Sequence, residues 1–473
     1  MSESRREVML AGAILLVGLL GLGAQALSDP VSPPAPVPAE ARHVERATFC
    51  PPPVDEEQTS MRAAIAPVSG EGIPIDFEDA TTSTVASPAP PENSEVAEGA
   101  FLLHEGAGGA FNAVGYGDKP IGGAIQSWTK PATGAGATLC SERPSDTWYF
   151  PAGSSELGFD ERLLLYNPFP DEAVARVTFF TPTGERAKAS LDDVAVPSGG
   201  STEIEVNKFM NTQKVLSATV ESLRGRLMAW KVLFVEPDGA PEGATFTIGA
   251  PEPAPKWFFP QGFLGDGAEE TLSILNPTEE EVSATVTIFS PDVGLGPADL
   301  PEIQLEPSTS QEISMEDLKL ELAEDVDLAH LSVVVTSNQG IPIVVERSVT
   351  FDEGADGVTS EVGITKPGTR WLLPPLAKSA TEDELVILNS GRQTAQISAQ
   401  VMTLEGTESP KALSDLKVAR AGRLERSLSD LSVEGPFFVV VTSDHPITVE
   451  RRAQVGTDLA DVMGRSVAPL GDE

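Results

Sequence analysis

Three tryptophans open a repeated aromatic motif and are the residues best suited to bind a ligand. Trp148, Trp257 and Trp371 begin the segments WYFPAG, WFFPQG and WLLPP, and an asparagine ending an apolar run follows each of them 18 or 19 residues later. An exposed aromatic ring on a β-sheet can stack on a sugar ring, but large aromatic rings are usually mostly buried. The motif is therefore compatible with a glycan-binding surface or with anchors that hold each module to its core or its neighbour. The fixed distance from an apolar strand favours anchors.

Cys50 and Cys140 are the only two cysteines of the chain. Neither belongs to a Cys-x-x-Cys motif, which argues against the usual zinc and redox sites. In an exported protein they would form a disulfide, which would close a long loop and contribute roughly 4 kcal/mol in the chain-entropy model. Two free thiols are the alternative if the chain stays in a reducing compartment.

No recognisable motif for catalysis or metal binding is present. None of the histidines has metal-ligand spacing, and no nucleophile elbow or EF-hand loop occurs. Gly134 and Gly136 lack the context of a phosphate-binding loop, so we expect them in ordinary loops. The acidic clusters 279–281 and 382–384 could hold calcium weakly, although solvated turns explain them more simply. We therefore expect no catalytic residue, no cofactor and no metal, and a protein that is not an enzyme. The four histidines are His43, His104, His330 and His445.

The tryptophan motif recurs after 109 and then 114 residues, which is the length of a small domain. Residues 173–180 alternate between two faces, the period of a half-buried strand. About six or seven such strands per repeat, separated by Gly, Pro and Asn turns, predict an all-β fold of tandem two-sheet sandwiches resembling immunoglobulin or fibronectin type III modules.

A second signature closes the later repeats. Pro342 leads to Glu346-Arg347, and Pro446 leads to Glu450-Arg451, in each case through three apolar or β-branched residues. We expect each of these segments to be a strand of a closing hairpin. The Glu-Arg pairs are predicted to be surface pairs at strand ends, which contribute little to stability.

The segment before Trp148 looks like a fourth, divergent module. The segment from Thr48 to Pro51 lies about one period before Trp148, and residues 118–125 weakly repeat the closing hairpin. The predicted boundaries are 46–145 for the divergent module, 146–250 for repeat 1, 255–365 for repeat 2 and 369–468 for repeat 3.

The N-terminus predicts export. Residues 1–7 contain two arginines and would form a short cytoplasmic tail, and residues 8–27 are uncharged and long enough to cross a bilayer. A retained transmembrane anchor is the favoured interpretation, and a cleaved signal peptide is the alternative because Ala24-Gln25-Ala26 resembles a cleavage site. Residues 28–45 form a proline-rich spacer that would hold the modules away from the membrane.

The formal net charge of -39 argues against binding to nucleic acid or to an anionic membrane surface. It is compatible with high solubility, a saline habitat or a basic partner, and a solvated acidic surface without a specific partner is the simplest explanation.

Several of these features together resemble a known family. They are Cys50-Pro51 after an apolar N-terminal segment, Cys140 shortly before Trp148–Gly153, and an apolar run that ends in Asn167-Pro168. This arrangement resembles an actinobacterial family of uncharacterised exported proteins, classed as a domain of unknown function. Repeat 3 departs from the pattern, because it lacks the glycine after Pro375 and the proline after Asn389. The resemblance implies a location in the cell envelope and implies no chemistry.

The sequence thus predicts a membrane-anchored extracytoplasmic protein, or a secreted one if the N-terminal segment is cleaved. Its expected function is a non-enzymatic scaffold or interaction protein of the cell envelope. The alternative is a cell-wall glycan-binding or adhesive protein. The two differ in one observable way, because a glycan binder should expose at least one of the three motif tryptophans and a scaffold should bury them all.

Overall fold

A computed structural model describes most of the chain from residue 46 onward. The described ranges are 46–51, 60–67, 73–79, 94–96, 100–106, 111–115, 121–130, 134–236, 242–263, 267–290, 298–299, 302–319, 330–351, 357–375, 382–455, 458–463 and 465–466. The predicted cytoplasmic tail, transmembrane segment and proline-rich spacer lie outside these ranges. Within them, no helix has both the length and the apolar character needed to cross a bilayer.

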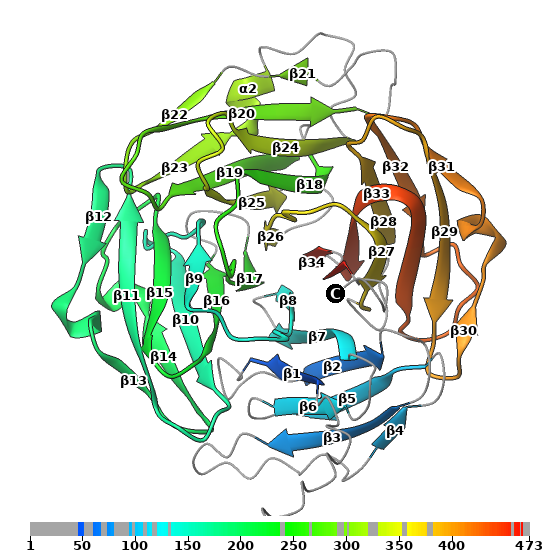
Figure 1. Cartoon of the computed structure of the whole chain (residues 1–473), viewed down its shortest axis with the longest axis horizontal. Helices are drawn as coiled ribbons and strands as arrows, with labels where there is room; N and C mark the ends of the chain where they lie inside the picture. The colour runs from blue at the N-terminus through cyan, green and yellow to red at the C-terminus, as the bar shows by residue number, and fades with distance from the viewer. Residues whose placement is uncertain are drawn as a thin grey trace, which may run out of the picture. The chain divides into compact units, whose positions relative to one another are not determined.

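The described chain is nearly all β, and every strand pairing in it is antiparallel (Figure 1). The divergent module contains two four-stranded sheets, ordered β1-β6-β3-β4 and β5-β2-β7-β8. Its strands are β1 (Arg46–Cys50), β2 (Ser60–Pro67), β3 (Ile73–Asp79), β4 (Ser94–Val96), β5 (Leu102–Gly106), β6 (Phe111–Gly115), β7 (Ile121–Lys130) and β8 (Gly134–Leu139).

Repeat 1 pairs an outer sheet, β12-β11-β15-β9 with β13 beside β11, with an inner sheet, β14-β10-β16-β17. Side chains of both sheets form one hydrophobic core that includes Trp148, Leu163 and Val177. The strands are β9 (Thr147–Phe150), β10 (Phe159–Asn167), β11 (Ala173–Thr181), β12 (Gly184–Ala187), β13 (Val194–Val196), β14 (Gly200–Glu205), β15 (Ser217–Arg224), β16 (Met228–Val235) and β17 (Gly243–Ile248).

Repeat 2 has the same plan, with an outer sheet β18-β24-β20-β21, in which β22 also pairs with β20, and an inner sheet β23-β19-β25-β26. One short helix, α2 (Met315–Lys319), follows β23. The strands are β18 (Lys256–Gly262), β19 (Ala268–Asn276), β20 (Val282–Phe289), β21 (Ala298–Asp299), β22 (Ile303–Leu305), β23 (Thr309–Ser314), β24 (Leu331–Ser337), β25 (Val344–Phe351) and β26 (Gly357–Val362).

Repeat 3 departs from this plan in one strand. β33 runs without a break where repeat 2 has the two strands β24 and β25, so its first half pairs with β29 and its second half with β28. The closing hairpin predicted around Pro446 is therefore one strand, which bends from the outer to the inner sheet. The strands are β27 (Gly368–Leu373), β28 (Glu382–Asn389), β29 (Ala395–Met402), β30 (Thr407–Glu408), β31 (Leu416–Val418), β32 (Gly422–Ser427), β33 (Phe438–Val455), β34 (Asp458–Met463) and β35 (Arg465–Ser466).

The last long strand of each module was not predicted from the sequence. The prediction of loops at Gly134 and Gly136 is wrong, because both lie in β8, and β17, β26 and β34 hold the matching places in the three repeats. β8 contacts β17, β17 contacts β26, β26 contacts β34, and β34 contacts β8 (Figure 1). The four modules therefore meet in a closed cycle of neighbours, in which each central strand is covered by others instead of being left as a free sheet edge.

Residues Glu45–Glu473 form one compact unit. β27 of repeat 3 begins at Gly368, one residue before the range predicted for that repeat. The modules are not separate bodies on linkers. We call the contact between consecutive modules a seam: the first joins the divergent module to repeat 1, the second joins repeats 1 and 2, the third joins repeats 2 and 3, and the closing seam joins repeat 3 to the divergent module.

Candidate functional site at the seams between modules

The three motif tryptophans are buried in β9, β18 and β27. Trp148, Trp257 and Trp371 are 2%, 1% and 1% exposed. Each indole N–H donates to a backbone carbonyl: Trp148 to Leu227 at 3.1 Å, Trp257 to Ile343 at 2.9 Å, and Trp371 to Gly368 at 3.0 Å. A buried indole needs such a partner for its N–H. These rings pin the opening strand of each repeat to its core and present no face on which a sugar could stack.

The repeated asparagines have an equally internal role. The side-chain amide of Asn276 donates to the carbonyls of Glu280 at 2.7 Å and Glu306 at 3.0 Å, and its oxygen accepts from the N–H of Thr278 at 3.0 Å. Asn167 and Asn389 make the same pattern of contacts in repeats 1 and 3. Each asparagine thus holds the turn that follows its strand, which explains why the apolar runs end in this residue.

Cys50 and Cys140 form the predicted disulfide. Phe49 pairs with Ser141 in the divergent module as Tyr149 pairs with Ala250 in repeat 1 and Phe258 with Ile364 in repeat 2. Cys50 therefore stands where the repeats have Phe150 or Phe259, and Cys140 stands where they have Gly249 or Gly363. In the repeats the phenylalanine ring lies directly against the glycine: a Cβ added to Gly249 would come within 2.8 Å of the Phe150 ring. In the divergent module, the disulfide thus takes the place of the contact between a phenylalanine ring and a glycine that repeats 1 and 2 have at these positions.

One cation is buried at the same register position in every repeat. Lys231, Arg347 and Arg451 lie opposite Leu163, Leu272 and Leu385 of the adjacent strand. An acidic residue lies two positions before each of these leucines, namely Glu161, Glu270 and Asp383. These six charged residues are all at most 8% exposed. Buried charges must be paired and hydrogen bonded to be tolerated.

At the second seam, the cation of repeat 1 is paired from outside its own module. Glu346 of β25 accepts from the Lys231 ammonium at 2.6 Å and from the Ala152 N–H at 3.1 Å. The hydroxyl of Ser360 on β26 also donates to Glu346, at 2.6 Å. The ammonium donates in addition to the carbonyl of Ala152. A carboxylate of repeat 2 therefore fills a polar socket in repeat 1.

The third seam repeats this arrangement one module later. Glu450 of β33 accepts from the Arg347 guanidinium at 2.5 Å and from the Gln261 N–H at 2.9 Å. Arg347 also donates to the carbonyl of Gln261. The Glu-Arg dipeptides are therefore not surface pairs, and that prediction is wrong: each glutamate serves the preceding seam, Arg347 serves the third seam, and Arg451 is buried within repeat 3.

At the other two seams an uncharged residue holds the register position of the incoming glutamate. Ile125 of β7 lies opposite Leu139 at the register that Glu346 and Glu450 hold in their own modules, so Arg451 is neutralised within repeat 3. Its guanidinium donates to Asp383 at 2.8 and 2.5 Å. At the first seam Trp230 takes the position of the glutamate, and its indole N–H donates to the carbonyl of Leu139 at 3.1 Å.

The second seam carries one acidic group more than it carries basic groups. Burial raises the pKa of Glu161 to about 8; Lys231 opposes this shift, Glu346 adds to it, and the N–H of Ser154 opposes it as a donor to the carboxylate. The Glu161 oxygen accepts from that N–H at 3.0 Å. Glu161 is therefore a protonated, neutral carboxyl around neutral pH.

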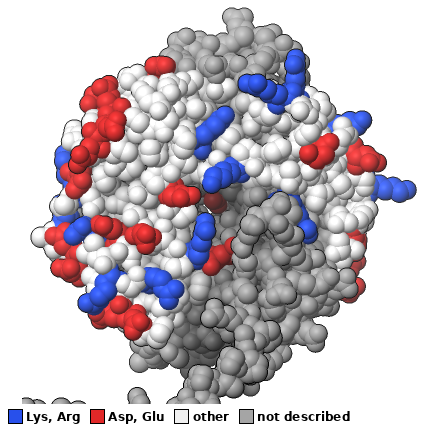
Figure 2. Space-filling model, in the orientation of Figure 1, with Lys and Arg blue, Asp and Glu red and all other residues white. Residues whose placement is uncertain are grey.

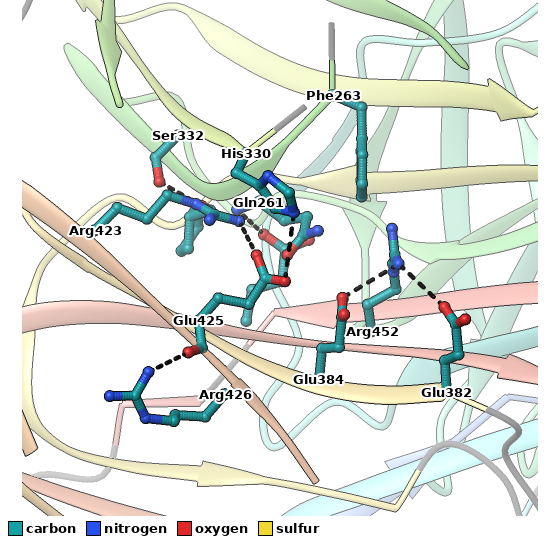
Figure 3. Close-up of polar contacts among 12 residues, drawn as sticks. Gln261, Phe263, His330, Ser332, Glu382, Glu384, Arg423, Glu425, Arg426 and Arg452 are labelled. Carbon is teal, nitrogen blue, oxygen red and sulfur yellow. Dashed lines mark hydrogen bonds and ion pairs between the residues drawn. The ribbon is translucent and has the colours of Figure 1, made fainter. Parts of the chain in front are cut away.

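A second polar network lies at the edge of the third seam (Figure 3). Glu425 of β32 accepts from Arg423 at 2.7 Å and lies 3.9 Å from His330, which precedes β24 in repeat 2. Arg452 lies 3.2 Å from Glu384 and 3.9 Å from Glu382. Lys214 and Glu312 make a matching contact of 4.0 Å across the second seam.

Glu384 has a raised pKa, first because it is partly buried; Arg452 opposes the shift, and Glu425 adds to it by charge and by a hydrogen bond. This carboxyl pair is the arrangement of the described chain that most resembles an acid–base site. Its members are nevertheless held by one another and by the flanking arginines.

The described side chains contain no group of three or more His, Cys, Asp or Glu residues placed to hold a metal ion. His330 lies at the third seam, and His445 lies at the bend of β33. His104 falls in β5, where only the backbone is described, and His43 lies outside the described residues. The cluster 279–281 is an exposed turn between β19 and β20, whereas in the cluster 382–384 Asp383 is engaged by Arg451.

Comparison with known proteins places the chain in a family. The model of the family described as "Family of unknown function (DUF5719)" matches residues 110–323 and again residues 265–464. The chain belongs to this family. The two matches overlap within repeat 2, in agreement with the internal repetition of this DUF5719 chain. No curated protein matches it.

Two solved structures show local similarity. One is titled "Crystal Structure of Thermotoga maritima 1070", at 22% identity over 24% of this chain and 95% of that chain, with a TM-score of 0.20. The other is the Anabaena sensory rhodopsin transducer, at 23% identity over 20% of this chain and 80% of that chain, with a TM-score of 0.17. Neither carries an activity over to the DUF5719 chain.

The pairing of residues across the seams of this DUF5719 chain was missed because a glutamate and an arginine that are adjacent in the sequence suggest an ion pair with each other. In a strand, adjacent side chains point to opposite faces, so Glu346 and Arg347 cannot face each other. The available signal was the apolar run before each dipeptide, Val344-Val345 in repeat 2, which is typical of a strand buried on both faces.

Proposed function

We propose that this chain is a non-enzymatic scaffold or interaction protein of the cell envelope, built from immunoglobulin- or fibronectin-like sandwiches joined in a closed cycle. One observation carries the proposal: the recurrent aromatic, amide and charged residues all serve internal contacts. Trp257 anchors a strand, Asn276 holds a turn, and Glu346 with Lys231 joins two modules. Because the residues that recur in each repeat hold the modules together internally, we infer that the chain is specialised to keep a fixed shape.

The proposal places the body outside the cytoplasm, held by residues 8–27 or released after their cleavage. The Cys50–Cys140 disulfide supports this location, since such bonds persist in oxidising compartments. The net charge of -39 supports a partner other than nucleic acid. A protein of the envelope, or a cell-wall polymer, remains the proposed partner.

Tryptophan fluorescence of residues 45–473 tests the proposal, with acrylamide or iodide as quencher and with cell-wall polysaccharide added. We expect blue-shifted, poorly quenched emission that the polysaccharide leaves unchanged, because the motif tryptophans are buried. Red-shifted emission that becomes protected when glycan is added would overturn the scaffold proposal and favour the glycan-binding alternative.

A further inference from the structure

The second seam encloses an odd number of charged groups. Glu161 and Lys231 belong to repeat 1 and Glu346 to repeat 2, and their exposed fractions are 1%, 0% and 0%. With both carboxyls ionised, this buried set would carry one uncompensated negative charge. An uncompensated charge away from water is strongly unfavourable and is commonly avoided by protonation.

The contacts show which carboxyl can hold the extra proton. Glu346 accepts from three donors, the Lys231 ammonium, the Ala152 N–H and the Ser360 hydroxyl. Glu161 accepts from the Ser154 N–H at 3.0 Å. The charged groups that act on Glu161 are Lys231 on β16 and Glu346 on β25, and they oppose each other. Burial is the largest effect on Glu161, and it favours the protonated, neutral form of this carboxyl.

We propose that the second seam is a proton-operated lock, closed while Glu161 holds a proton beside the Lys231–Glu346 ion pair, and easier to open once an opened seam allows Glu161 to ionise. Opening would place Glu161 in water, where its pKa would return toward 4.5 from the value of about 8 in the closed seam. Between those two pH values the closed form binds one proton more than the open form. The equilibrium constant for opening therefore rises by as much as tenfold per pH unit and levels off above about pH 8.

Other seams provide internal references. At the first seam Trp230 holds the register position of Glu346, and at the closing seam the ion pair described for Arg451 is with Asp383 of its own module. β8 contacts the neighbouring central strands at these two seams and takes no part in the second. Its backbone should therefore not follow the ionisation of Glu161.

The test is hydrogen–deuterium exchange of the full chain between pH 5 and pH 9. The protection factor, which divides out the pH dependence of intrinsic exchange, is compared for peptides covering β17 and β26 and for β8. We expect protection of β17 and β26 to fall by up to tenfold per unit up to about pH 8, with β8 unchanged. A flat profile for β17 and β26, or an equal fall in β8, would overturn the proposal.

Two substitutions sharpen the result. Glu161→Gln and Glu346→Gln each leave one acidic and one basic group in the seam, so either should abolish the pH dependence of β17. β26 is left out of this comparison, because it also borders the third seam, where Glu270, Arg347 and Glu450 form a similar buried set. Glu205→Gln, at the end of β14 in repeat 1 with its carboxylate 44% exposed, is the matched control and should leave the profile unchanged. If one seam variant fails to fold, the other decides. A wild-type slope retained in a folded seam variant would contradict the lock.

Discussion

At the scale of single residues, the residues that recur in each module make hydrogen bonds to the main chain. The asparagines, tryptophans and buried cations all donate to main-chain carbonyls. The same residue therefore recurs in each module because each module has an equivalent main-chain carbonyl that accepts its hydrogen bond. In repeat 2, the Asn276 amide donates a hydrogen bond to the carbonyl of Glu280 in the turn before β20, and the Trp257 indole donates one to the carbonyl of Ile343.

Asn276→Ala should destabilise the protein by about 1 to 3 kcal/mol, because it removes a buried side chain that donates to the part-buried carbonyls of Glu280 and Glu306 and accepts from the N–H of Thr278. The midpoint of urea unfolding with an unchanged slope measures the loss. Gln396→Ala, at an exposed position of β29, is the control and should change stability by less than about 0.5 kcal/mol. Equal effects from the two substitutions would show that the amide clamp contributes nothing.

The cysteine pair allows a sharper substitution, because repeats 1 and 2 show what can stand in its place. Reduction, or Cys50→Ala with Cys140→Ala, should cost roughly 4 to 5 kcal/mol by restoring the freedom of a loop of 90 residues. Cys50→Phe with Cys140→Gly should recover part of that loss by rebuilding the contact that Phe150 makes on Gly249. Thermal unfolding of the two double variants under identical conditions compares them. A Phe/Gly variant no more stable than the Ala/Ala variant would refute the equivalence of these positions.

At the scale of elements, the sequence predicted the strands that alternate strongly and missed those that do not. β11 has a clear period of two in its buried positions and was predicted almost to the residue. The central strands β17 and β26 are short, begin with glycine and mix threonine with apolar residues, so they carry little periodic signal. They are strands because neighbouring modules cover them. That contact between modules could not be read from any single repeat.

The candidate site was predictable only in part, for the same reason. The tryptophans and cysteines were identified, and the disulfide was predicted correctly. The pairing of Lys231 with Glu346 was not, since these residues are 115 positions apart and belong to different modules. Repeat 1 also hides the pattern, because Trp230 replaces the glutamate of the Glu-Arg dipeptide.

The third seam yields a prediction about pairing between elements. Arg347→Met should destabilise the protein by about 3 to 5 kcal/mol, because it leaves Glu450 buried without its cation. Adding Glu450→Gln should restore much of that loss, since the remaining amide is neutral. Denaturant unfolding of both single variants and the double variant gives the coupling energy.

Surface ion pairs provide the control for this cycle. The pair Arg176–Glu221 spans 3.0 Å with side chains that are 42% and 49% exposed, and its own cycle should give less than about 1 kcal/mol. A coupling at Arg347–Glu450 as small as this surface value would show that the seam is held by apolar packing alone.

At the scale of the whole molecule, two kinds of acidic group must be distinguished. Most are solvated: Figure 2 shows acidic side chains along the outer side of repeat 1, which carries β11, β12 and β15, with basic side chains interspersed. They repel one another over distances that salt can screen. The acidic groups at the seams are removed from water, and salt reaches them much less.

Both kinds of acidic group make stability depend on pH, and added salt can separate their two contributions. The pKa of Glu161 is raised to about 8, and the pKa values of Glu203, Glu312 and Glu384 are also raised, in each case first by burial. An acid whose pKa is higher in the folded chain binds more protons there than when unfolded, so stability falls as pH rises from about 4.5 toward the folded value. The melting temperature should therefore be higher at pH 5.5 than at pH 8.

Surface repulsion changes stability in the same direction, because acidification lowers the net negative charge. At 1 M salt, where the Debye length is about 3 Å, that contribution should largely vanish and the buried contribution should remain. A difference between pH 5.5 and 8 that persists at 1 M salt and shrinks in Glu161→Gln would assign it to the seams. A difference that salt abolishes would assign it to the acidic surface, and the seam carboxyls would then be ionised in the folded protein.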